Sequence, residues 1–244
     1  MSDMPLLGKN ILVTGAARRI GRSLARACAQ AGANIVVHFH DSEKDAAEVR
    51  AEIAEMGRRA MLVKADLENS TEVEGIVKQG SELGPLHGLV NNAAIFQSLT
   101  PKETTLEAWE RHLAINLTAP FLLSKAFAEQ VPKDGSGRIV NIVDWRALRP
   151  GPDHFPYTIT KAALASMTHS LAAALAPQIS VNALALGAIL PPSDNGVKPE
   201  ILKTVPAGRW GELLEVEETL IFLLSGPAYI TGEIIHVDGG RHLI

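Results

Sequence analysis

Hydrophobic residues in this chain fall into short uninterrupted runs, and longer segments with apolar residues at helical spacing lie between those runs. A short run that is apolar throughout predicts a strand buried on both faces, whereas the helical spacing predicts helices. This alternation predicts an α/β fold whose doubly wound parallel sheet has helices on both faces. A ligand would then bind at the carboxyl ends of the strands. The predicted strands are Ile11–Val13, Ile35–Phe39, Ala60–Val63, Leu86–Val90, Arg138–Val143, Ile179–Ala185 and Ile234–Val237.

Two segments depart from this alternation. The segment Thr105–Val131 is long for one helix, and Asn116 and Pro120 interrupt it. The segment Leu184–Pro199 contains three prolines and predicts a loop. We expect this loop, over about residues 187–200, to form a lid on the substrate.

The composition narrows the class of protein. Of the 244 residues 46% are hydrophobic, enough for one sizeable core, so we expect residues 1–244 to form a single domain. A formal net charge of −4 argues against nucleic acid as a partner. The one cysteine, Cys28, excludes an intrachain disulfide and a thiolate metal cage, and we expect it on the buried side of a helix. The sequence shows neither signal-peptide features nor a membrane-spanning apolar run, which predicts a cytoplasmic protein without a membrane partner.

A glycine-containing turn, Thr14–Gly21, follows the first predicted strand and opens a helix. Gly15 permits a tight turn and Gly21 lets the helix approach the sheet, while the free N–H groups of the helix start attract pyrophosphate. This pattern predicts a dinucleotide site, although the turn could serve only as a connection. Arg19 stands where the usual fingerprint has a further glycine, and its guanidinium could reach phosphate or substrate.

The end of the second strand predicts which nicotinamide dinucleotide binds, because an acidic residue there holds the ribose hydroxyl of NAD. Phe39 occupies that position, which favours NADP(H) over NAD(H), while Asp41 would oppose the extra phosphate. Donors to that phosphate are available from Arg18, Arg19, His40 and Ser42.

His38 and His40 share one strand face, so the alternative is that they bind a metal ion. Two ligands without a third nearby do not make a metal site, so we expect no metal.

Tyr157 and Lys161 lie four residues apart, so on a helix they share one face. The ammonium group would favour the phenolate and lower the pKa of Tyr157 from about 10. Tyr157 would then be a usable acid near neutral pH. The alternative is a tyrosine ring that packs beside a long lysine side chain.

These motifs, taken in order, resemble the short-chain dehydrogenase/reductase family, whose fold is a Rossmann-like sheet. Beyond the glycine turn and the Tyr157–Lys161 pair, the resemblance rests on Asp66-Leu67, Asn91-Asn92-Ala93-Ala94, Asn116, Ile230-Thr231-Gly232 and Val237-Asp238-Gly239-Gly240.

The resemblance implies a cofactor site along the carboxyl ends of the strands. Asp66 and Leu67 would hold the adenine, and Asn91 would lie beside a ribose; the alternatives are a turn carboxylate and turn-forming amides. The full set of expected cofactor residues is Gly15, Arg18, Arg19, Ile20, Gly21, His40, Ser42, Asp66, Leu67, Asn92, Ala93, Lys161 and Gly187.

The resemblance also implies catalytic roles for Tyr157, Lys161 and Asn116, and we expect Asp144 to complete the catalytic set. Lys161 would bond the nicotinamide ribose and tune Tyr157. Asn116 would anchor the water of a proton relay, or alternatively cap a break in the helix.

Asp144 departs from the family pattern, because a serine normally stands at this distance before the tyrosine. A carboxylate repels a substrate oxygen unless it is protonated, but it accepts from ring N–H and amino groups or shares a proton with Tyr157. Asp144 therefore predicts a nitrogen heterocycle as substrate. The alternative is a turn aspartate after the strand.

Arg19, Asp144 and Phe96 together resemble the pteridine reductase branch of the family, in which an aromatic ring sandwiches a flat pterin. Asp41 and the Leu186-Gly187 dipeptide depart from that branch. A core position is the alternative for Phe96. The expected substrate-binding residues are Arg19, Phe96, Asp144 and Tyr157.

We therefore predict an NADPH-dependent oxidoreductase that reduces a pterin or dihydrofolate-like heterocycle, with Tyr157 as proton donor. A general carbonyl reductase, for instance of the 3-oxoacyl type, is the alternative enzyme, and a non-catalytic NADP-binding protein is the alternative outside enzymes. Family members are commonly homotetramers, which is our expectation here.

Overall fold

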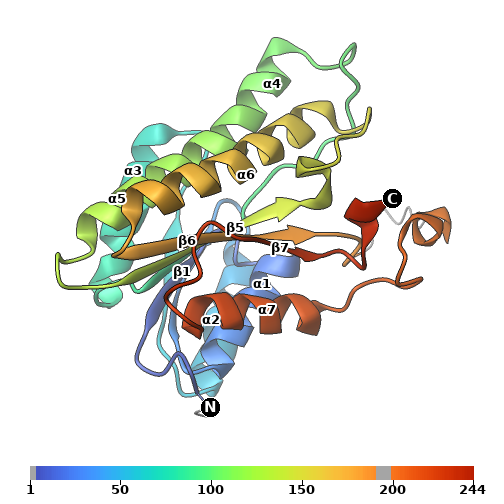
Figure 1. The fold of residues 1–244 in the computed structure, drawn as a ribbon. Coiled ribbons are helices and arrows are strands. Elements are labelled where there is room, and N and C mark those ends of the chain that lie inside the picture. Colours follow the sequence, from blue (N-terminus) through green and yellow to red (C-terminus); the bar gives the residue numbers. More distant parts are fainter. Residues whose placement is uncertain (1–3, 191–198) are drawn as a thin grey trace.

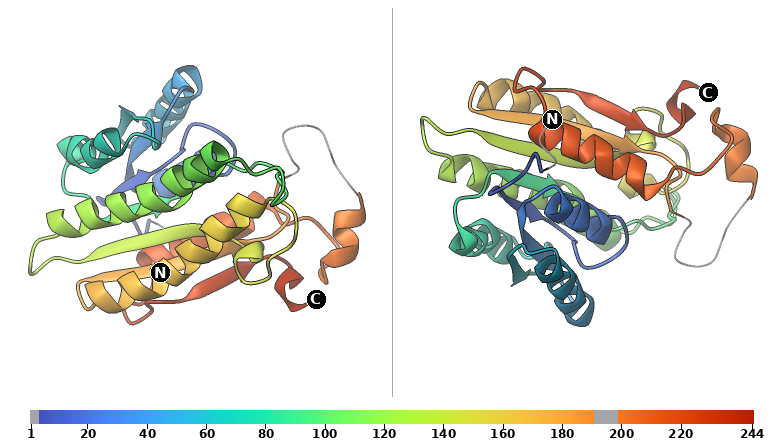
Figure 2. Two further views of the ribbon diagram at one scale, coloured as in Figure 1. Left: turned by 90° about the horizontal axis from the view of Figure 1, so that it is seen from above. Right: turned by 90° about the horizontal axis from the view of Figure 1, so that it is seen from below.

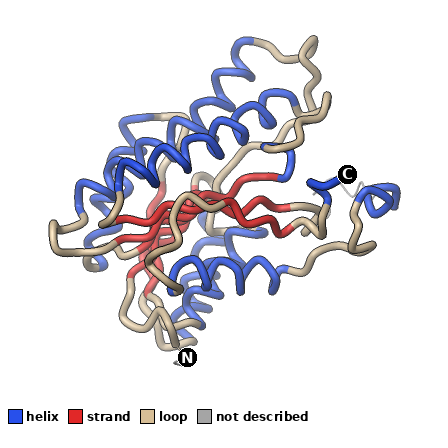
Figure 3. Tube along the Cα trace, in the orientation of Figure 1, coloured by secondary structure: helices blue, strands red, loops and turns tan. Residues whose placement is uncertain are grey.

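A computed structural model describes residues 4–190 and 199–244 of the chain. Seven parallel strands form one sheet in the order β3-β2-β1-β4-β5-β6-β7, seen at the centre of Figures 1 and 3. The strands are β1 Asn10–Val13, β2 Asn34–Phe39, β3 Ala60–Lys64, β4 Gly88–Asn91, β5 Gly137–Asp144, β6 Ile179–Leu186 and β7 Ile234–Val237. All seven predicted strands are confirmed, and the largest difference is that β4 begins at Gly88 rather than at Leu86.

Helices cover both faces of the sheet. α4, α5 and α6 lie together on one face, and α1 and α7 pack against each other on the opposite face, as the two views of Figure 2 show. The helices are α1 Arg19–Gln30, α2 Glu43–Glu55, α3 Ser70–Gly80, α4 Leu106–Leu113, α5 Ala119–Gln130, α6 Phe155–Leu175 and α7 Leu213–Ser225. The predicted doubly wound α/β fold is confirmed.

Burial on both faces explains why the strands are apolar throughout. In β1, Ile11 and Val13 belong to the core under α1 and α7, while Leu12 between them belongs to the core under α3 and α5. Successive side chains of a strand point to opposite faces, so each position needs an apolar residue. Cys28 is fully buried on α1, as predicted.

The interruption predicted in Thr105–Val131 is a π-helical turn, Ala114–Thr118, between α4 and α5. Pro120 lies in the first turn of α5, where a missing backbone N–H costs little. Such turns are frequent at functional sites. This one carries Asn116, whose side chain is buried.

The predicted loop is only partly described. β6 extends to Leu186, so the loop begins later than Leu184, and residues 191–198 of the expected lid lie outside the described residues. Across the described part of the chain, no helix has the length and apolar character needed to cross a membrane.

Candidate active site

A cavity of about 970 Å³ opens at the carboxyl ends of the central strands, where β1 and β4 are neighbours and the strand order reverses. This is the crevice in which doubly wound folds bind ligands. Most of the predicted site residues line it: Gly15, Arg18, Arg19, Ile20, Gly21, Asn92, Ala93, Phe96, Asp144, Tyr157, Lys161 and Gly187. The tertiary structure therefore brings together segments that are far apart in sequence.

The glycine turn leaves room for a phosphate because Gly15 and Gly21 lack side chains where two backbone segments approach each other. Gly15 adopts a φ of +61°, which favours glycine. A Cβ on Gly21 would lie 2.1 Å from the carbonyl oxygen of Gly15. On the other side of the cavity, a Cβ on Gly187 would lie 2.5 Å from the Cα of Asp238. The turn around Gly15 and Gly21, which we call the glycine cradle, and the start of α1 fit the pyrophosphate of a dinucleotide.

Arg19 is the first residue of α1 and has a φ of +50°, a region that residues other than glycine rarely adopt. The backbone thus keeps the geometry of the glycine that the usual fingerprint has here. The side chain of Arg19 lines the cavity. Such backbone strain at a ligand site is typical of functional positions.

Asn92 and Thr14 hold the glycine turn against the end of β4. The side-chain amide of Asn92 donates to the carbonyl of Thr14 at 2.8 Å, and the hydroxyl oxygen of Thr14 accepts from the backbone N–H of Asn92 at 2.9 Å. These reciprocal bonds fix the position of the turn relative to the rest of the cavity.

His38 anchors the same turn, a role that the sequence reading missed. Its Nδ1 accepts from the N–H of Gly15 at 3.1 Å, and its Nε2 lies 3.2 Å from the carbonyl of Ala65, an arrangement that fits the neutral ring. Burial lowers the pKa of His38 to about 4. No cluster of three metal-ligating side chains occurs among the described residues. A buried histidine at the end of a strand is the signal that could have indicated this role.

Three of the four predicted donors to the extra phosphate of NADP have carboxylate neighbours. Arg18 Nε donates to Asp45 at 2.6 Å, His40 Nε2 lies 3.6 Å from Asp66, and Ser42 donates to Asp41 at 3.2 Å. His40 and Ser42, together with Asp66 and Leu67, lie at the ends of β2 and β3 and do not line the cavity.

Asp66 has the geometry of the turn carboxylate considered as its alternative, because its Oδ1 accepts from the N–H of Glu68 at 2.9 Å. Leu67 is buried. A role of either residue in holding adenine stays a prediction.

Asn91 does not line the cavity, so its predicted place beside a ribose stays a prediction. Its side chain is buried and donates to Asn141 Oδ1 at 2.8 Å and to the hydroxyl of Ser124 at 3.3 Å. Asn91 therefore ties β4 to β5 and α5, and its neighbour Asn92 lines the cavity instead. The alternation of side chains along a strand separates these two amides.

Tyr157 and Asp144 form the polar centre of the cavity. The phenolic hydroxyl of Tyr157 donates to Oδ2 of Asp144 at 3.2 Å, and the Tyr157 side chain is buried. Asp144 also accepts from the N–H of Arg146 at 2.9 Å. Burial raises the pKa of Asp144 above its ordinary 3.8.

The expectation that Lys161 lowers the pKa of Tyr157 is wrong in this structure. Burial, and then the charge of Asp144 and the hydrogen bond to it, raise the pKa of Tyr157 well above its ordinary 10.0. The ammonium of Lys161 donates to the carbonyl of Ile142 at 2.7 Å, and it lies 5.7 Å from the centroid of the Tyr157 ring. Burial lowers the pKa of Lys161 to about 8. Asp144 is thus the stronger influence on Tyr157.

Asn116 holds the loop after β4 against α6. Its amide accepts from the N–H of Ile95 at 2.9 Å and donates to the carbonyl of Ile95 at 3.0 Å and to the hydroxyl of Thr160 at 3.2 Å. Thr160 in turn donates to the backbone carbonyl of Tyr157 at 2.7 Å. Asn116 is buried and does not line the cavity, so its anchoring of a relay water stays a prediction.

Phe96 provides an aromatic wall beside Tyr157. The side chain is 49% exposed, so the alternative of a core phenylalanine is wrong. Its ring meets that of Tyr157 edge-on at 4.6 Å between centroids and stacks on His154 at 4.0 Å. The ring and the Tyr157–Asp144 pair therefore face the same cavity.

Trp145, Arg146 and Arg241 line the cavity beside Asp144 and were not singled out from the sequence. Trp145 and Arg146 directly follow Asp144, so their position after a strand end was an available signal. Arg241 belongs to the C-terminal turn, and no local pattern places it here.

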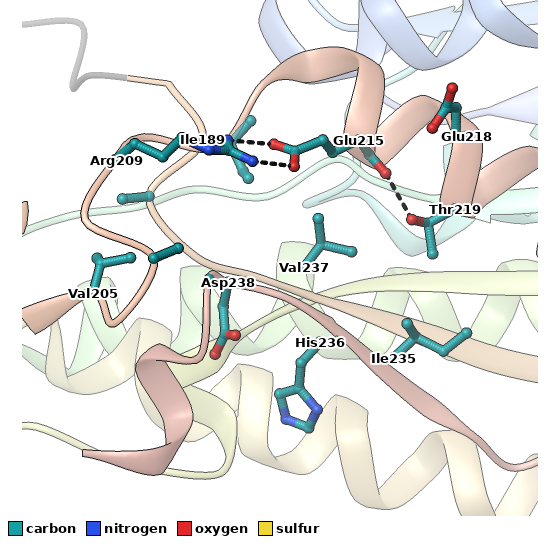
Figure 4. Close-up of a pocket in the computed structure, with 14 residues that line it drawn as sticks. Ile189, Val205, Arg209, Glu215, Glu218, Thr219, Ile235, His236, Val237 and Asp238 are labelled. Carbon is teal, nitrogen blue, oxygen red and sulfur yellow. Dashed lines mark hydrogen bonds and ion pairs between the residues drawn. The ribbon is translucent and has the colours of Figure 1, made fainter.

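A smaller cavity of about 360 Å³ lies between the ends of β6 and β7 and the start of α7 (Figure 4). Ala188 and Ile189 line both cavities. In the smaller one, Glu215 pairs with Arg209 and its backbone carbonyl accepts from the hydroxyl of Thr219. Tyr157, Lys161 and Asp144 line the larger cavity, which is therefore the candidate active site.

Known proteins resemble this chain over nearly its whole length. A family model described as enoyl-(acyl carrier protein) reductase matches residues 15–242. A curated relative, the 3-oxoacyl-[acyl-carrier-protein] reductase of Synechocystis, is 37% identical over 94% of this chain and 95% of its own length.

Solved structures extend the likeness to the whole fold. The alternative dihydrofolate reductase FolM of Brucella canis, complexed with NADP, is 37% identical with a TM-score of 0.90, covering 99% of this chain and 96% of that one. A blue fluorescent protein from a metagenomic library, in complex with NADPH, is 34% identical with a TM-score of 0.91, covering 97% and 99%. The sheet, the cavity and these matches together show that this chain is an oxidoreductase of the short-chain dehydrogenase/reductase family.

Proposed function

We propose that this protein is an NADPH-dependent reductase of a pterin or dihydrofolate-like heterocycle, with Tyr157 as the proton donor. The observation that carries the proposal is the hydrogen bond of 3.2 Å from Tyr157 to Asp144, in a cavity whose wall includes the exposed ring of Phe96.

The cofactor is NADP(H), which supplies the hydride when it is bound. The glycine cradle at Gly15 and Gly21, with the start of α1, fits its pyrophosphate. Lys161, Asn92 and Gly187 line the part of the cavity that would hold the nicotinamide half. Solved relatives from Brucella canis and from the metagenomic library are complexes with NADP and NADPH.

Asp144 selects the substrate by charge. Beside a ketone oxygen its carboxylate would be repulsive, whereas it accepts a hydrogen bond from the ring N–H or amino group of a heterocycle. Phe96 offers a flat surface for such a ring. Tyr157 gives its hydroxyl proton to a ring nitrogen, which balances the hydride delivered to the adjacent carbon. Burial and then Asp144 raise the pKa of Tyr157, so the phenol carries its proton until a ring nitrogen accepts it.

A reductase of 3-oxoacyl groups is the second candidate, supported by the name of the Synechocystis relative. The alternative dihydrofolate reductase of Brucella canis, which is also 37% identical, supports the first candidate. Asp144 decides our preference for the heterocycle.

The proposal is tested by following NADPH and NADH oxidation with dihydrobiopterin, dihydrofolate and a simple ketone. Reduction of the two heterocycles with NADPH, faster than with NADH, supports it. Activity confined to the ketone or to a 3-oxoacyl substrate would establish the second candidate, and cofactor binding without any oxidation would establish a non-catalytic role.

We also propose that the whole chain acts as one domain in a cytoplasmic homotetramer. Phe121 on α5 and Ile159 on α6 are exposed apolar residues near Asn116 and Tyr157, on the helices we expect to pack against partner copies. Light scattering of the purified protein tests the assembly.

A further inference from the structure

Two guanidinium groups lie over the ring of Trp145 at one wall of the cavity. The Cζ atom of Arg241 is 4.2 Å from the ring centroid, and that of Arg146 is 4.9 Å from it. All three residues line the same cavity as Tyr157. Stacking on tryptophan holds a guanidinium in place while leaving its N–H groups free to donate in the ring plane.

The two arginines differ in how their charge is balanced. Arg146 donates to Asp153 at 3.0 Å and lies 3.7 Å from Asp144. No described residue forms an ion pair or a hydrogen bond with the Arg241 side chain, and its Nε is buried without a partner. Burial lowers the pKa of Arg241 more than the nearby Asp144, Asp153 and Asp238 raise it. The Arg241 side chain lines the cavity, so an anionic group of a ligand would meet its terminal N–H groups and balance its charge.

The nearest carboxylate of its own segment is already occupied. Asp238 accepts from the backbone N–H of Gly240 at 2.9 Å and from that of His242 at 2.8 Å, and it lies 2.8 Å from the His242 ring. These bonds lock the C-terminal turn Arg241–Leu243, which follows β7 at the end of the chain (Figure 1). Arg241 itself lines the cavity. Asp238 therefore fixes the turn that carries Arg241 and forms no ion pair with that arginine.

We propose that Trp145 and Arg241 form a subsite for a carboxylate-bearing arm of the substrate. The inference rests on the proposed function and narrows it: the substrate is a flat heterocycle with an anionic arm, as in dihydrofolate, rather than a neutral pterin. A planar guanidinium binds a carboxylate through two parallel hydrogen bonds. Burial, and then the charge of Arg146, lower the pKa of Arg241, and Arg146 adds to the positive potential at this wall.

Steady-state kinetics with NADPH test the subsite. Arg241→Met should raise the KM for dihydrofolate about 10-fold or more beyond any change in the KM for dihydrobiopterin, since hydrogen bonds to charged groups contribute about 1.5–3 kcal/mol. The KM of Arg241→Lys for dihydrofolate should lie between those of the unaltered protein and of Arg241→Met. Arg50→Met, which removes the same charge from the exposed surface of α2, should behave like the unaltered protein. Equal effects of Arg241→Met on both substrates, or no effect on either, would overturn the proposal.

A binding measurement separates this inference from the proposed function. Calorimetric titration of p-aminobenzoylglutamate, the anionic arm of folates, into the protein saturated with NADP⁺ should show binding that Arg241→Met weakens about 10-fold or more. Lack of binding, or equal binding by the variant, refutes the subsite. If the protein reduces no pterin or folate, the proposed function fails, and this titration still decides the subsite.

Discussion

Tyr157 donates its phenolic hydrogen to Asp144 across a distance of 3.2 Å, and this bond joins the start of α6 to the end of β5. Burial, and then the charge of Asp144 and the hydrogen bond to it, raise the pKa of the Tyr157 phenol. The phenol therefore keeps its proton, because a buried phenolate beside a carboxylate would be unfavourable. The chemistry that we propose depends on this arrangement.

Replacing Tyr157 by Phe should lower kcat about 10²–10⁴-fold, the range that a positioned proton donor contributes. NADPH binding should persist, because the phenol ring and the glycine cradle remain. Stopped-flow turnover and fluorescence titration of NADPH measure the two effects. Undiminished turnover would show that another group supplies the proton.

Replacing Asp144 by Ser should reduce turnover of dihydropterins about 10-fold or more, since a charged acceptor for the ring N–H is lost. Turnover of simple ketones should fall less or rise, because the repulsion of a carbonyl oxygen disappears. The ratio of kcat/KM for the two substrates is the readout. Equal losses on both would remove the argument for a heterocycle.

Replacing Gly21 by Ala should weaken NADPH binding about 10-fold or more. The new Cβ would lie 2.1 Å from the Gly15 carbonyl oxygen, and overpacking of this kind costs about 1–3 kcal/mol. Gly75→Ala is the matched control, because its Cβ on α3 meets only the end of the Gln79 side chain at 3.3 Å. Dissociation constants for NADPH should separate the two variants; similar values would mean that the turn does not carry the cofactor.

His38 should make the protein less stable in mild acid. Its pKa in the folded protein is about 4, below the ordinary 6.5, so the unfolded chain binds the proton more readily. The stabilisation is complete above pH 6.5 and is lost as the pH falls toward 4, by up to roughly 3 kcal/mol. His40 and Asp66 are the charged neighbours that modify this value.

Urea unfolding at two pH values on either side of 6 measures the contribution of His38. The free energy of unfolding of the unaltered protein should drop more between them than that of His38→Gln, whose amide does not titrate. The same drop in both proteins would assign the acid sensitivity to other groups.

The architecture was predictable from local patterns. Each strand position of β1 needs an apolar side chain because both faces are covered, and this produces an unbroken run that is readable without coordinates. The glycine turn and the Tyr157–Lys161 spacing were readable for the same reason, since backbone geometry and helix periodicity act over a few residues.

Distances between remote residues were not readable in this way. The opposite orientations of Asn91 and Asn92, and the anchoring of Gly15 by His38, follow from how β4 and β2 sit in the sheet. The sign of the Tyr157 pKa shift could not be predicted from the helical spacing of Lys161, because burial and Asp144 determine it.

The order of residues alone thus determined the sheet, the phosphate turn and the family of this protein, because propensity and periodicity are local properties of a chain. The tertiary structure alone decided which groups share the cavity and in what state of charge. Arg241 reaches Trp145 only because β7 lies next to β6. Solvation and electrostatics depend on all neighbours in space, and those neighbours come from every part of the sequence.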